Sequence, residues 1–268
     1  MALTWDHDPG KPKTMTKIIL TRHGHVEGIQ PERFRGRTEL PLTPRGISQA
    51  RAVAVRIAAS WKPSAIYTSP MGRCVVTAEY IAQACKAPDQ VLNELNDFNY
   101  GTWQGSLNTE MRAAWPKLYF DWYNTPQLVR FPDGDSLQDV SARTADALRL
   151  ILQRHPDEQV VLVAHDSVNR VLLTQLLDQP LSTFWRITQD PCCLNEIDIV
   201  DGNVRVLRIN ETHHLAAGRL NDILAAKLSR AAPPRLRRRR SFSCPSWLQT
   251  RALLRRRRPP ALRSAHAA

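Results

Sequence analysis

Two histidines and an arginine stand where a phosphoryl group could be transferred. Arg22 and His23 follow directly on the apolar residues 17–21, and His165 follows the apolar residues 159–164. An imidazole can act as a nucleophile or a proton carrier near neutral pH. A guanidinium group binds phosphate through a planar fork of donors. These residue types predict phosphoryl chemistry.

A second arginine and two acids extend this set. Arg73 lies one turn into a helix that we expect to open at Ser69-Pro70, and Glu94 and Asp97 follow a short strand expected at residues 91–93. The arginines and His165 would neutralise the equatorial oxygens of the phosphoryl group. A carboxylic acid would protonate the leaving oxygen. Residue types alone leave Glu94 and Asp97 as alternatives for this role.

Glu94 and two further residues are candidates for the substrate pocket. His25 and Arg35 lie near Arg22 in sequence, in and before a polar loop that ends at residue 42. Either could contact an acidic substrate, and for each the alternative is an exposed loop position. The five cysteines show no metal-ligand spacing, so we expect no metal and no cofactor. Their odd number and lack of pattern favour reduced thiols in a cytoplasmic protein.

The elements that must position these residues alternate between strands and helices. Thr43-Pro44 is typical of a helix start, with threonine as the N-cap and proline in the first turn. The continuous apolar run 159–164 is typical of a strand covered on both faces. The expected strands are residues 17–21, 65–68, 91–93, 159–164, 194–200 and 204–209; the expected helices run from 43 to before Pro63, from 69 to 85, from 136 to 154 and from 168 to 177. Residues 101–132 are aromatic-rich and are expected to be irregular.

This alternation predicts an α/β fold of three layers: a doubly wound, mostly parallel sheet with helices on both faces and a small cap insertion. The carboxyl ends of such strands are where ligands bind. The expected organisation is a disordered arm at 1–16, the main domain at 17–212, a possible terminal helix at 213–228 and a disordered Arg-rich tail at 229–268.

The net charge of +12 belongs to that tail. Residues 230–268 contain 12 arginines and no Asp or Glu, so the rest of the chain is balanced. Nucleic acid is therefore an expected partner only through the tail, which could also be inert. We expect no signal peptide in the first 14 residues and no membrane span, because no apolar run approaches about 18 residues.

Taken in order, these motifs resemble the histidine phosphatase superfamily, in its phosphoglycerate-mutase-like branch, near the broad-specificity and alpha-ribazole-phosphatase-like members. The similarity covers residues 17–210. The motif segments are Arg22-His23-Gly24, Leu42-Thr43-Pro44-Arg45-Gly46, Ser69-Pro70-Met71-Gly72-Arg73, the stretch from Leu95 to Gly105, and Val163-Ala164-His165-Asp166.

The resemblance implies roles for individual residues. His23 matches the nucleophile that becomes phosphohistidine, and the matching phosphate-binding residues are Arg22, Arg73 and His165. The proton donor of the family is usually a glutamate four residues before a Tyr-Gly pair. Asp97 occupies that position before Gly101, so the register favours Asp97 over Glu94.

The sequence also departs from the family pattern. Ile29 replaces an asparagine of phosphoglycerate mutases, and Asp166 replaces the glycine that usually follows the second histidine. The stretch between Asp97 and His165 is shorter than in true mutases. These departures favour hydrolysis, so the expected function is a metal-independent phosphomonoesterase acting on a small phosphorylated metabolite. The alternatives are a phosphoglycerate mutase and, from another class, a non-catalytic module that binds a phospho-ligand or a protein.

Overall fold

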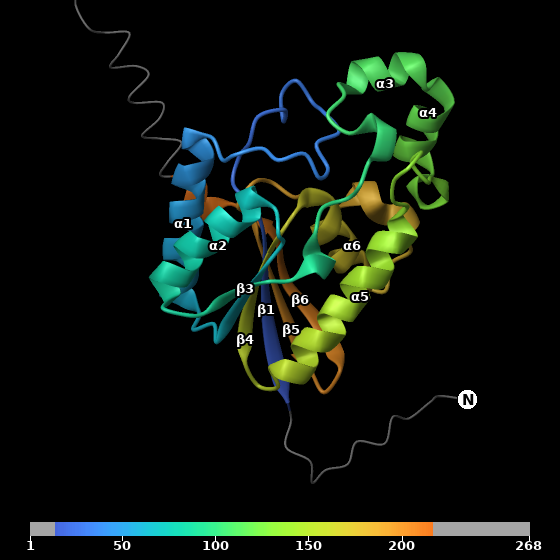
Figure 1. Ribbon diagram of the computed structural model, residues 1–268. Coiled ribbons are helices and arrows are strands. Elements are labelled where there is room, and N and C mark those ends of the chain that lie inside the picture. Colours follow the sequence, from blue (N-terminus) through green and yellow to red (C-terminus); the bar gives the residue numbers. More distant parts are fainter. Residues whose placement is uncertain (1–13, 217–268) are drawn as a thin grey trace, which may run out of the picture.

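The computed structural model describes residues 14–216, which are built around one six-stranded sheet (Figure 1). The strands are β1 (Met15–Arg22), β2 (Ala65–Thr68), β3 (Asp89–Val91), β4 (Gln159–Ala164), β5 (Leu194–Val200) and β6 (Asn203–Glu211). Their order across the sheet is β3-β2-β4-β1-β5-β6. The first four in this order pair in parallel, whereas β5 and β6 pair antiparallel. The predicted mostly parallel sheet is confirmed.

Helices cover both faces of this sheet (Figure 1). The α-helices are α1 (Pro44–Ser60), α2 (Gly72–Cys85), α3 (Asn108–Ala114), α4 (Pro116–Asn124), α5 (Leu137–Arg154) and α6 (Asp166–Leu176). The 3-10 helices are η1 (Asn93–Leu95), η2 (Gly101–Trp103), η3 (Pro126–Leu128), η4 (Leu181–Arg186) and η5 (His213–Leu215). α1 and α2 pack on one face and α5 and α6 on the other, which gives the three predicted layers.

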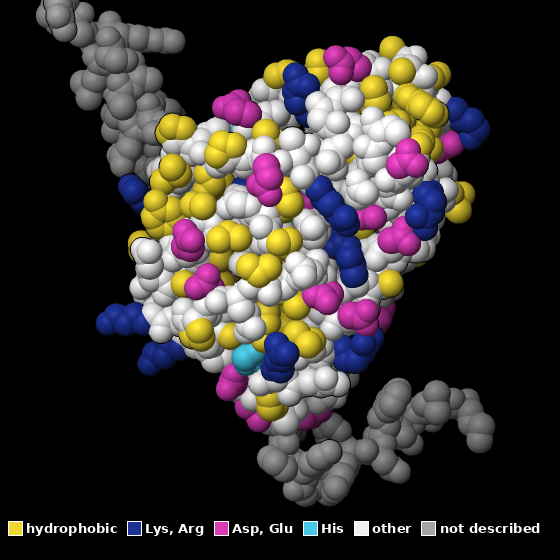
Figure 2. All heavy atoms as spheres, in the orientation of Figure 1, with side chains coloured by type: hydrophobic (Ala, Val, Ile, Leu, Met, Phe, Trp, Pro, Cys, Tyr) yellow, Lys and Arg dark blue, Asp and Glu magenta, His cyan; other side chains and the backbone are white. Residues whose placement is uncertain are grey.

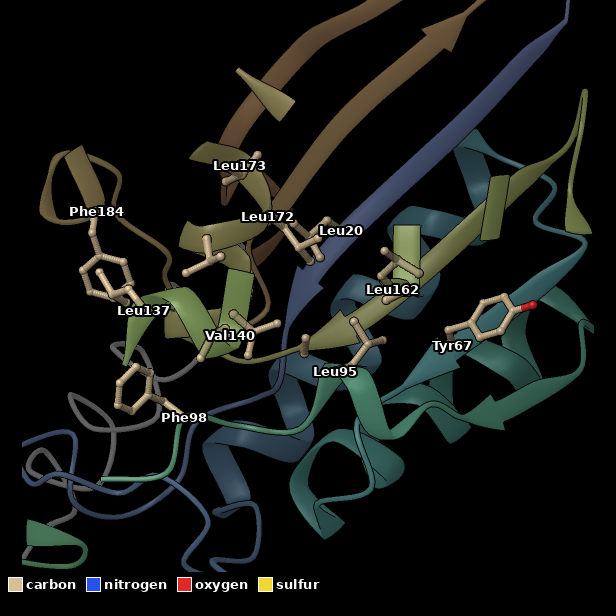
Figure 3. Packing of buried hydrophobic residues seen from close by; sticks show 14 of the residues in the cluster. Leu20, Tyr67, Leu95, Phe98, Leu137, Val140, Leu162, Leu172, Leu173 and Phe184 are labelled. Carbon is tan, nitrogen blue, oxygen red and sulfur yellow. The ribbon is translucent and has the colours of Figure 1, made fainter. Parts of the chain in front are cut away.

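The sheet divides the core into two hydrophobic clusters. Successive side chains of a strand point to opposite faces. Leu20 and Leu162 therefore join the cluster under α5 and α6, while Ile19 and Val161 join the cluster under α1 and α2. Figure 3 shows Leu20 and Leu162 together with Leu172 of α6 in the first of these clusters. Burial on both faces explains why β1 and β4 are apolar without alternation.

Local signals explain where the long helices begin. The side chain of Thr43 accepts a hydrogen bond from the Gly46 amide, so this residue is the predicted N-cap of α1. Ser136 caps α5, and Asp139 accepts a hydrogen bond from the Ser136 amide at 2.7 Å. This reciprocal pair is a capping box.

Several predicted boundaries shift by a few residues. α2 begins at Gly72 because the Ser69 amide still bonds to the Val163 carbonyl of the sheet. α6 begins at Asp166, before the predicted start, and β3 ends at Val91 because η1 follows. The last strand continues to Glu211.

The expectation that residues 101–132 are irregular is wrong. This stretch contains α3 and α4 and forms the small cap that the fold was predicted to carry. Pro116 opens α4 in its first turn, and Trp122 of that helix is buried. Trp115 and Phe120 remain exposed, and Figure 2 shows hydrophobic side chains on the surface over α3 and α4.

The predicted domain limits are only partly within the described residues. β1 starts at Met15, so two residues assigned to the N-terminal arm belong to the sheet. η5 covers the first residues of the possible terminal helix, and the rest of that helix and the Arg-rich tail lie outside residues 14–216. In the described part of the chain, no helix is long and apolar enough to cross a membrane.

Candidate active site

The carboxyl ends of the three central parallel strands bring the candidate residues together. The His23 amide bonds to the Ala164 carbonyl at 3.0 Å, and the Ser69 amide bonds to the Val163 carbonyl at 3.0 Å. The ends of β1, β2 and β4 are thus at one level of the sheet. The rings of His23 and His165 meet edge to face, with their centroids 5.2 Å apart.

The ring orientation of His23 is set by the backbone of the next residue, Gly24. Its Nδ1 lies 2.7 Å from the Gly24 carbonyl oxygen, and a carbonyl can only accept a hydrogen bond. In the neutral ring, Nδ1 therefore carries the proton and Nε2 keeps its lone pair. His23 is 2% exposed, so burial protects this arrangement from water.

Arg22 is a buried cation held from one side only. Its Nη1 donates to the Gln189 carbonyl at 2.5 Å. Its Nε is also buried and has no hydrogen-bond partner among residues 14–216. Because an unpaired buried donor is costly, this N–H is a ready site for an anionic ligand.

Arg73 and the acid Asp97 form a buried ion pair. Nη2 of Arg73 lies 2.9 Å from Oδ2 of Asp97, and the same guanidinium donates to the carbonyls of Gly36 and Thr38. Nδ1 of His165 lies 3.3 Å from the same carboxylate oxygen. The predicted arginine, acid and second histidine are thus in direct contact.

The other nitrogen of His165 is bound as well. Its Nε2 lies 2.7 Å from the hydroxyl of Ser69, the residue that follows β2. The thiol of Cys74 lies 3.5 Å from Nε2 and donates to the Ala164 carbonyl. His165 is therefore fixed from both β2 and α2.

Burial and neighbouring charge both keep the two histidines neutral. Burial lowers the pKa of His23 well below its ordinary value, and the charges of Arg73, His165 and Arg22 lower it further. Burial likewise lowers the pKa of His165, followed by the charges of Arg73 and Arg143. A neutral ring is the nucleophilic form, so the site favours attack by His23.

A cavity opens beside these residues. Its walls come from six regions: the end of β1, the loop of residues 32–36, the segment between η1 and η2, the cap, the start of α6, and η4. The residues lining it are Arg22, His23, Glu32, Arg33, Phe34, Arg35, Gly36, Asp97, Tyr100, Asn108, Trp122, Tyr123, Asp166, Ser167, Arg170 and Trp185. The predicted nucleophile and the predicted acid therefore line one cavity together with polar and aromatic side chains.

Of the three remaining candidates, one lines the cavity and two do not. Arg35 lines it and donates from Nη1 to the Gly28 carbonyl. His25 is not among the lining residues, and its Nδ1 contacts the hydroxyl of Thr43 at 3.0 Å. Glu94 is also absent from the lining and lies in η1.

Sequence reasoning missed several residues of the cavity. Asp166 was noted only as a departure, and Arg170, one turn further along α6, was not singled out at all. They form an ion pair of 2.7 Å between Oδ1 and Nε. Their i, i+4 spacing directly after His165 was the available signal. Among residues 14–216, no group of three His, Cys, Asp or Glu side chains is placed to hold a metal ion.

The chain is similar in sequence to known proteins. The profile of the histidine phosphatase superfamily (branch 1) matches residues 18–212. Phosphoserine phosphatase 1 of Hydrogenobacter thermophilus is 30% identical over 201 residues, which are 75% of this chain and 95% of that protein. A metal-independent phosphoserine phosphatase of Arabidopsis thaliana is 29% identical over 64% of this chain and 73% of its own length.

A probable mutase and a solved structure are also similar to this chain. A probable phosphoglycerate mutase GpmB of Proteus mirabilis is 31% identical over 69% of this chain and 85% of its own. The solved structure of Bacillus stearothermophilus YhfR has 28% identity and a TM-score of 0.71, and the similarity covers 75% of this chain and 99% of that one.

The fold and the site define a phosphate-transferring α/β enzyme, and the chain belongs to the histidine phosphatase superfamily. The two phosphatases among these relatives support a phosphatase, that is, a hydrolase of phosphate monoesters, and a mutase, as the third relative is named, is less favoured.

Proposed function

We propose that the chain hydrolyses small phosphate monoesters through a phosphohistidine formed on Nε2 of His23. The observation that carries this proposal is the contact between Nδ1 of His23 and the Gly24 carbonyl, which leaves Nε2 unprotonated. In the first step a bond forms between Nε2 and phosphorus while the bond from phosphorus to the ester oxygen breaks. In the second step water attacks phosphorus, and the nitrogen–phosphorus bond breaks.

Arg22, Arg73 and His165 are the residues that would hold the phosphoryl group. The unpartnered Nε of Arg22 supports its role as a donor to phosphate oxygens. Arg73 binds the Asp97 carboxylate in the free protein. A phosphate dianion would compete for this guanidinium, so substrate binding would release the carboxyl group for its own reaction. Positive charge around the phosphoryl oxygens stabilises the transition state.

We assign Asp97, rather than Glu94, as the acid. The released carboxylate would first accept a proton from solvent water. In the first step it would give this proton to the leaving alcohol oxygen, and in the second it would accept a proton from the attacking water. The support is positional: Asp97 lines the cavity beside His23 and contacts Arg73 and His165, whereas Glu94 lies outside the lining. The Phe98 amide donates to Oδ1 of Asp97 at 2.8 Å, which fixes the orientation of the carboxylate.

The names of two relatives make phosphoserine the first natural ester to assay. We also propose a cytoplasmic location, which the unpatterned cysteines favour. Cell fractionation tests the location: recovery in an exported fraction would contradict it.

The mechanism is tested by hydrolysis of p-nitrophenyl phosphate in the presence of EDTA. We expect EDTA-resistant activity that is lost in His23→Ala, together with acid-labile labelling of the wild type by radioactive substrate phosphate. Asp97→Asn should lower the rate by about 100- to 10,000-fold, the usual range for a general acid. Glu94→Gln is the matched control.

Three results would contradict the proposal. Retention of the label in His23→Ala would show that the phosphoryl group is not carried by His23. A large loss in Glu94→Gln with full activity in Asp97→Asn would reverse the assignment of the acid. Phosphoryl transfer to phosphoglycerate at a rate exceeding hydrolysis would make the chain a mutase.

A further inference from the structure

A carboxylate lines the same cavity as Arg22 and His23, and the proposed mechanism does not use it. Asp166 is the first residue of α6, directly after His165, and it lines the cavity together with Arg22 and His23. An anionic side chain at this place repels the phosphate dianion of a substrate. The ion pair with Arg170 offsets part of this repulsion, and the carboxylate remains on the cavity wall, where a cationic part of a substrate could meet it.

Arg170 holds this carboxylate in place. Nε of Arg170 lies 2.7 Å from Oδ1 of Asp166, while the contact from Nη2 to Oδ2 is long, at 3.5 Å. Oδ1 is thus engaged and Oδ2 retains acceptor capacity. Asp166 is part of a rigid helix and held by a neighbour, which is how a preorganised binding group is built.

Arg170 itself is held in place by other groups of the protein. Its Nη1 donates to the Phe184 carbonyl at 3.3 Å, and its guanidinium lies 5.5 Å from the ring centroid of Phe184 and 5.0 Å from that of Trp185. Cation–π contacts of this kind fix the guanidinium in position. Arg170 therefore orients Asp166 and is not a mobile clamp for an anion.

The cavity carries the opposite charge as well. Arg35 lines it, and the pKa of Arg35 is lowered by burial and by the nearby charge of Arg22. Two close guanidinium groups favour a bound anion. Burial raises the pKa of the Tyr100 hydroxyl group on the same wall, followed by the charge of Asp97 and, more weakly, that of Asp166. The cavity thus presents both signs of charge to the alcohol part of a substrate.

We propose that Asp166 is a specificity-determining residue that binds a primary ammonium group on the alcohol part of the substrate. The substrates so selected are aminoalkyl phosphates, of which phosphoserine and phosphoethanolamine are examples. This inference rests on the proposed phosphatase activity and adds the chemical class of ester that the site prefers. The Asp166 carboxylate would accept a hydrogen bond from the ammonium group, with opposite charges in contact.

A simpler role for Asp166 is to stabilise α6. An acid in the first turn of a helix and an i, i+4 pair with arginine both stabilise helices by a few tenths of a kcal/mol. That role makes no distinction between substrates, because it does not require contact with them. Substrate selectivity, and not overall activity, therefore separates the two roles.

The experiment compares two esters of the same skeleton, O-phospho-L-serine and 3-phospho-L-glycerate, which differ in an ammonium group against a hydroxyl group. The measured quantity is the ratio of their kcat/KM values. We expect the wild type to prefer phosphoserine, and Asp166→Asn to lower this ratio by about 10- to 100-fold, the value of one charge-assisted hydrogen bond.

Asp146→Asn is the matched control. Asp146 also pairs with an arginine on a helix, Arg149 of α5, at 2.6 Å, and both side chains are exposed. Its substitution removes one negative charge and one helical ion pair away from the cavity. The ratio of kcat/KM values should remain that of the wild type.

Binding measured by calorimetry in His23→Ala separates this inference from the proposed mechanism, because this variant lacks the nucleophile. Tighter binding of phosphoserine than of phosphoglycerate, weakened by adding Asp166→Asn, supports the role of Asp166 whatever the turnover shows. Equal binding of the two esters, or a preference that Asp166→Asn leaves unchanged, would overturn it. Loss of the phosphohistidine with the preference intact would refute only the mechanism.

Discussion

A single backbone contact decides which nitrogen of His23 can react. The Gly24 carbonyl accepts a hydrogen bond from Nδ1, and burial together with the charges of Arg73 and Arg22 disfavours a second proton. Neither effect needs a bound substrate. The proposed nucleophile is therefore already neutral in the free protein, and substrate binding need not deprotonate it.

The protonation of His23 can be measured directly by NMR. We expect its ring signals to show the neutral form at pH values below about 6.5, the usual histidine pKa. Arg73→Gln removes a positive charge that lowers this pKa, so the midpoint should rise in the variant. A wild-type midpoint at or above the usual value would contradict the assignment of charge and burial as its causes.

Two glycines allow α1 to approach the loop that carries His23. A Cβ added to Gly46 would lie 2.2 Å from the His25 carbonyl oxygen, and one added to Gly24 would lie 2.5 Å from the Gly46 carbonyl oxygen. The two backbones therefore touch. This contact explains why glycine stands in both motifs, the one after β1 and the one at the start of α1.

Gly46→Ala should disturb this junction. Because the neighbour is backbone and cannot rotate away, we expect a loss of about 1–3 kcal/mol in the free energy of unfolding, as for other overpacked sites. Phosphatase activity should fall with it, since His23 shares the loop. Gly72→Ala is the control, because its nearest new contact is the flexible Glu39 side chain at 3.3 Å. Equal stability of the two variants in urea unfolding would refute the explanation.

A second element, α5, positions the acid without touching the cavity. Arg143 donates to the Glu94 carbonyl at 2.7 Å and to the Asp97 carbonyl at 3.2 Å. It therefore holds the segment between η1 and the cap in place. Through this backbone it determines where the Asp97 carboxylate lies.

We expect Arg143→Gln to lower kcat by roughly 10- to 100-fold with a smaller effect on KM, because a small displacement of a catalytic group is costly. Steady-state kinetics on p-nitrophenyl phosphate measure this. Arg149→Gln, on the exposed side of the same helix, should behave as wild type. An equal loss in both variants, or a change in KM alone, would show that Arg143 does not position the acid.

At the scale of the whole molecule, the buried histidines link stability to pH. His23 and His165 have lowered pKa values in the folded protein and ordinary values near 6.5 in the unfolded chain. Below that pH the unfolded chain binds more protons than the folded protein does. Their contribution to stability is thus complete above about pH 6.5 and is lost as the pH falls.

We expect the free energy of unfolding to decrease below pH 6.5 by up to about 1.4 kcal/mol per pH unit for each of the two histidines. Urea unfolding at several pH values between 7.5 and 5 measures this slope. His23→Asn cannot titrate at that position, so its slope should be shallower than that of the wild type. An unchanged slope would show that His23 is not one of the linked groups.

The sequence by itself determined the strands and long helices of the domain. The uninterrupted apolar run of β4, the Thr43-Pro44 start of α1 and the periodicity of α5 are local patterns, and each reports burial or capping within a few residues. The order of the motifs also predicted the family. The sequence analysis misses the short helices of the cap: Tyr119, Trp122 and Tyr123 have helical spacing, but an aromatic-rich composition does not by itself predict a helix.

The tertiary structure alone decided how the site is assembled. It paired Asp97 with Arg73 and His165, placed Arg143 behind the acid, and left Glu94 and His25 outside the cavity lining. It also put Asp166 and its partner Arg170 into the cavity wall. The physical reason is range: a helix or strand reflects neighbours a turn away, whereas the cavity joins side chains from β1, the cap and α6. Their distances depend on how all the layers pack, which no local pattern encodes.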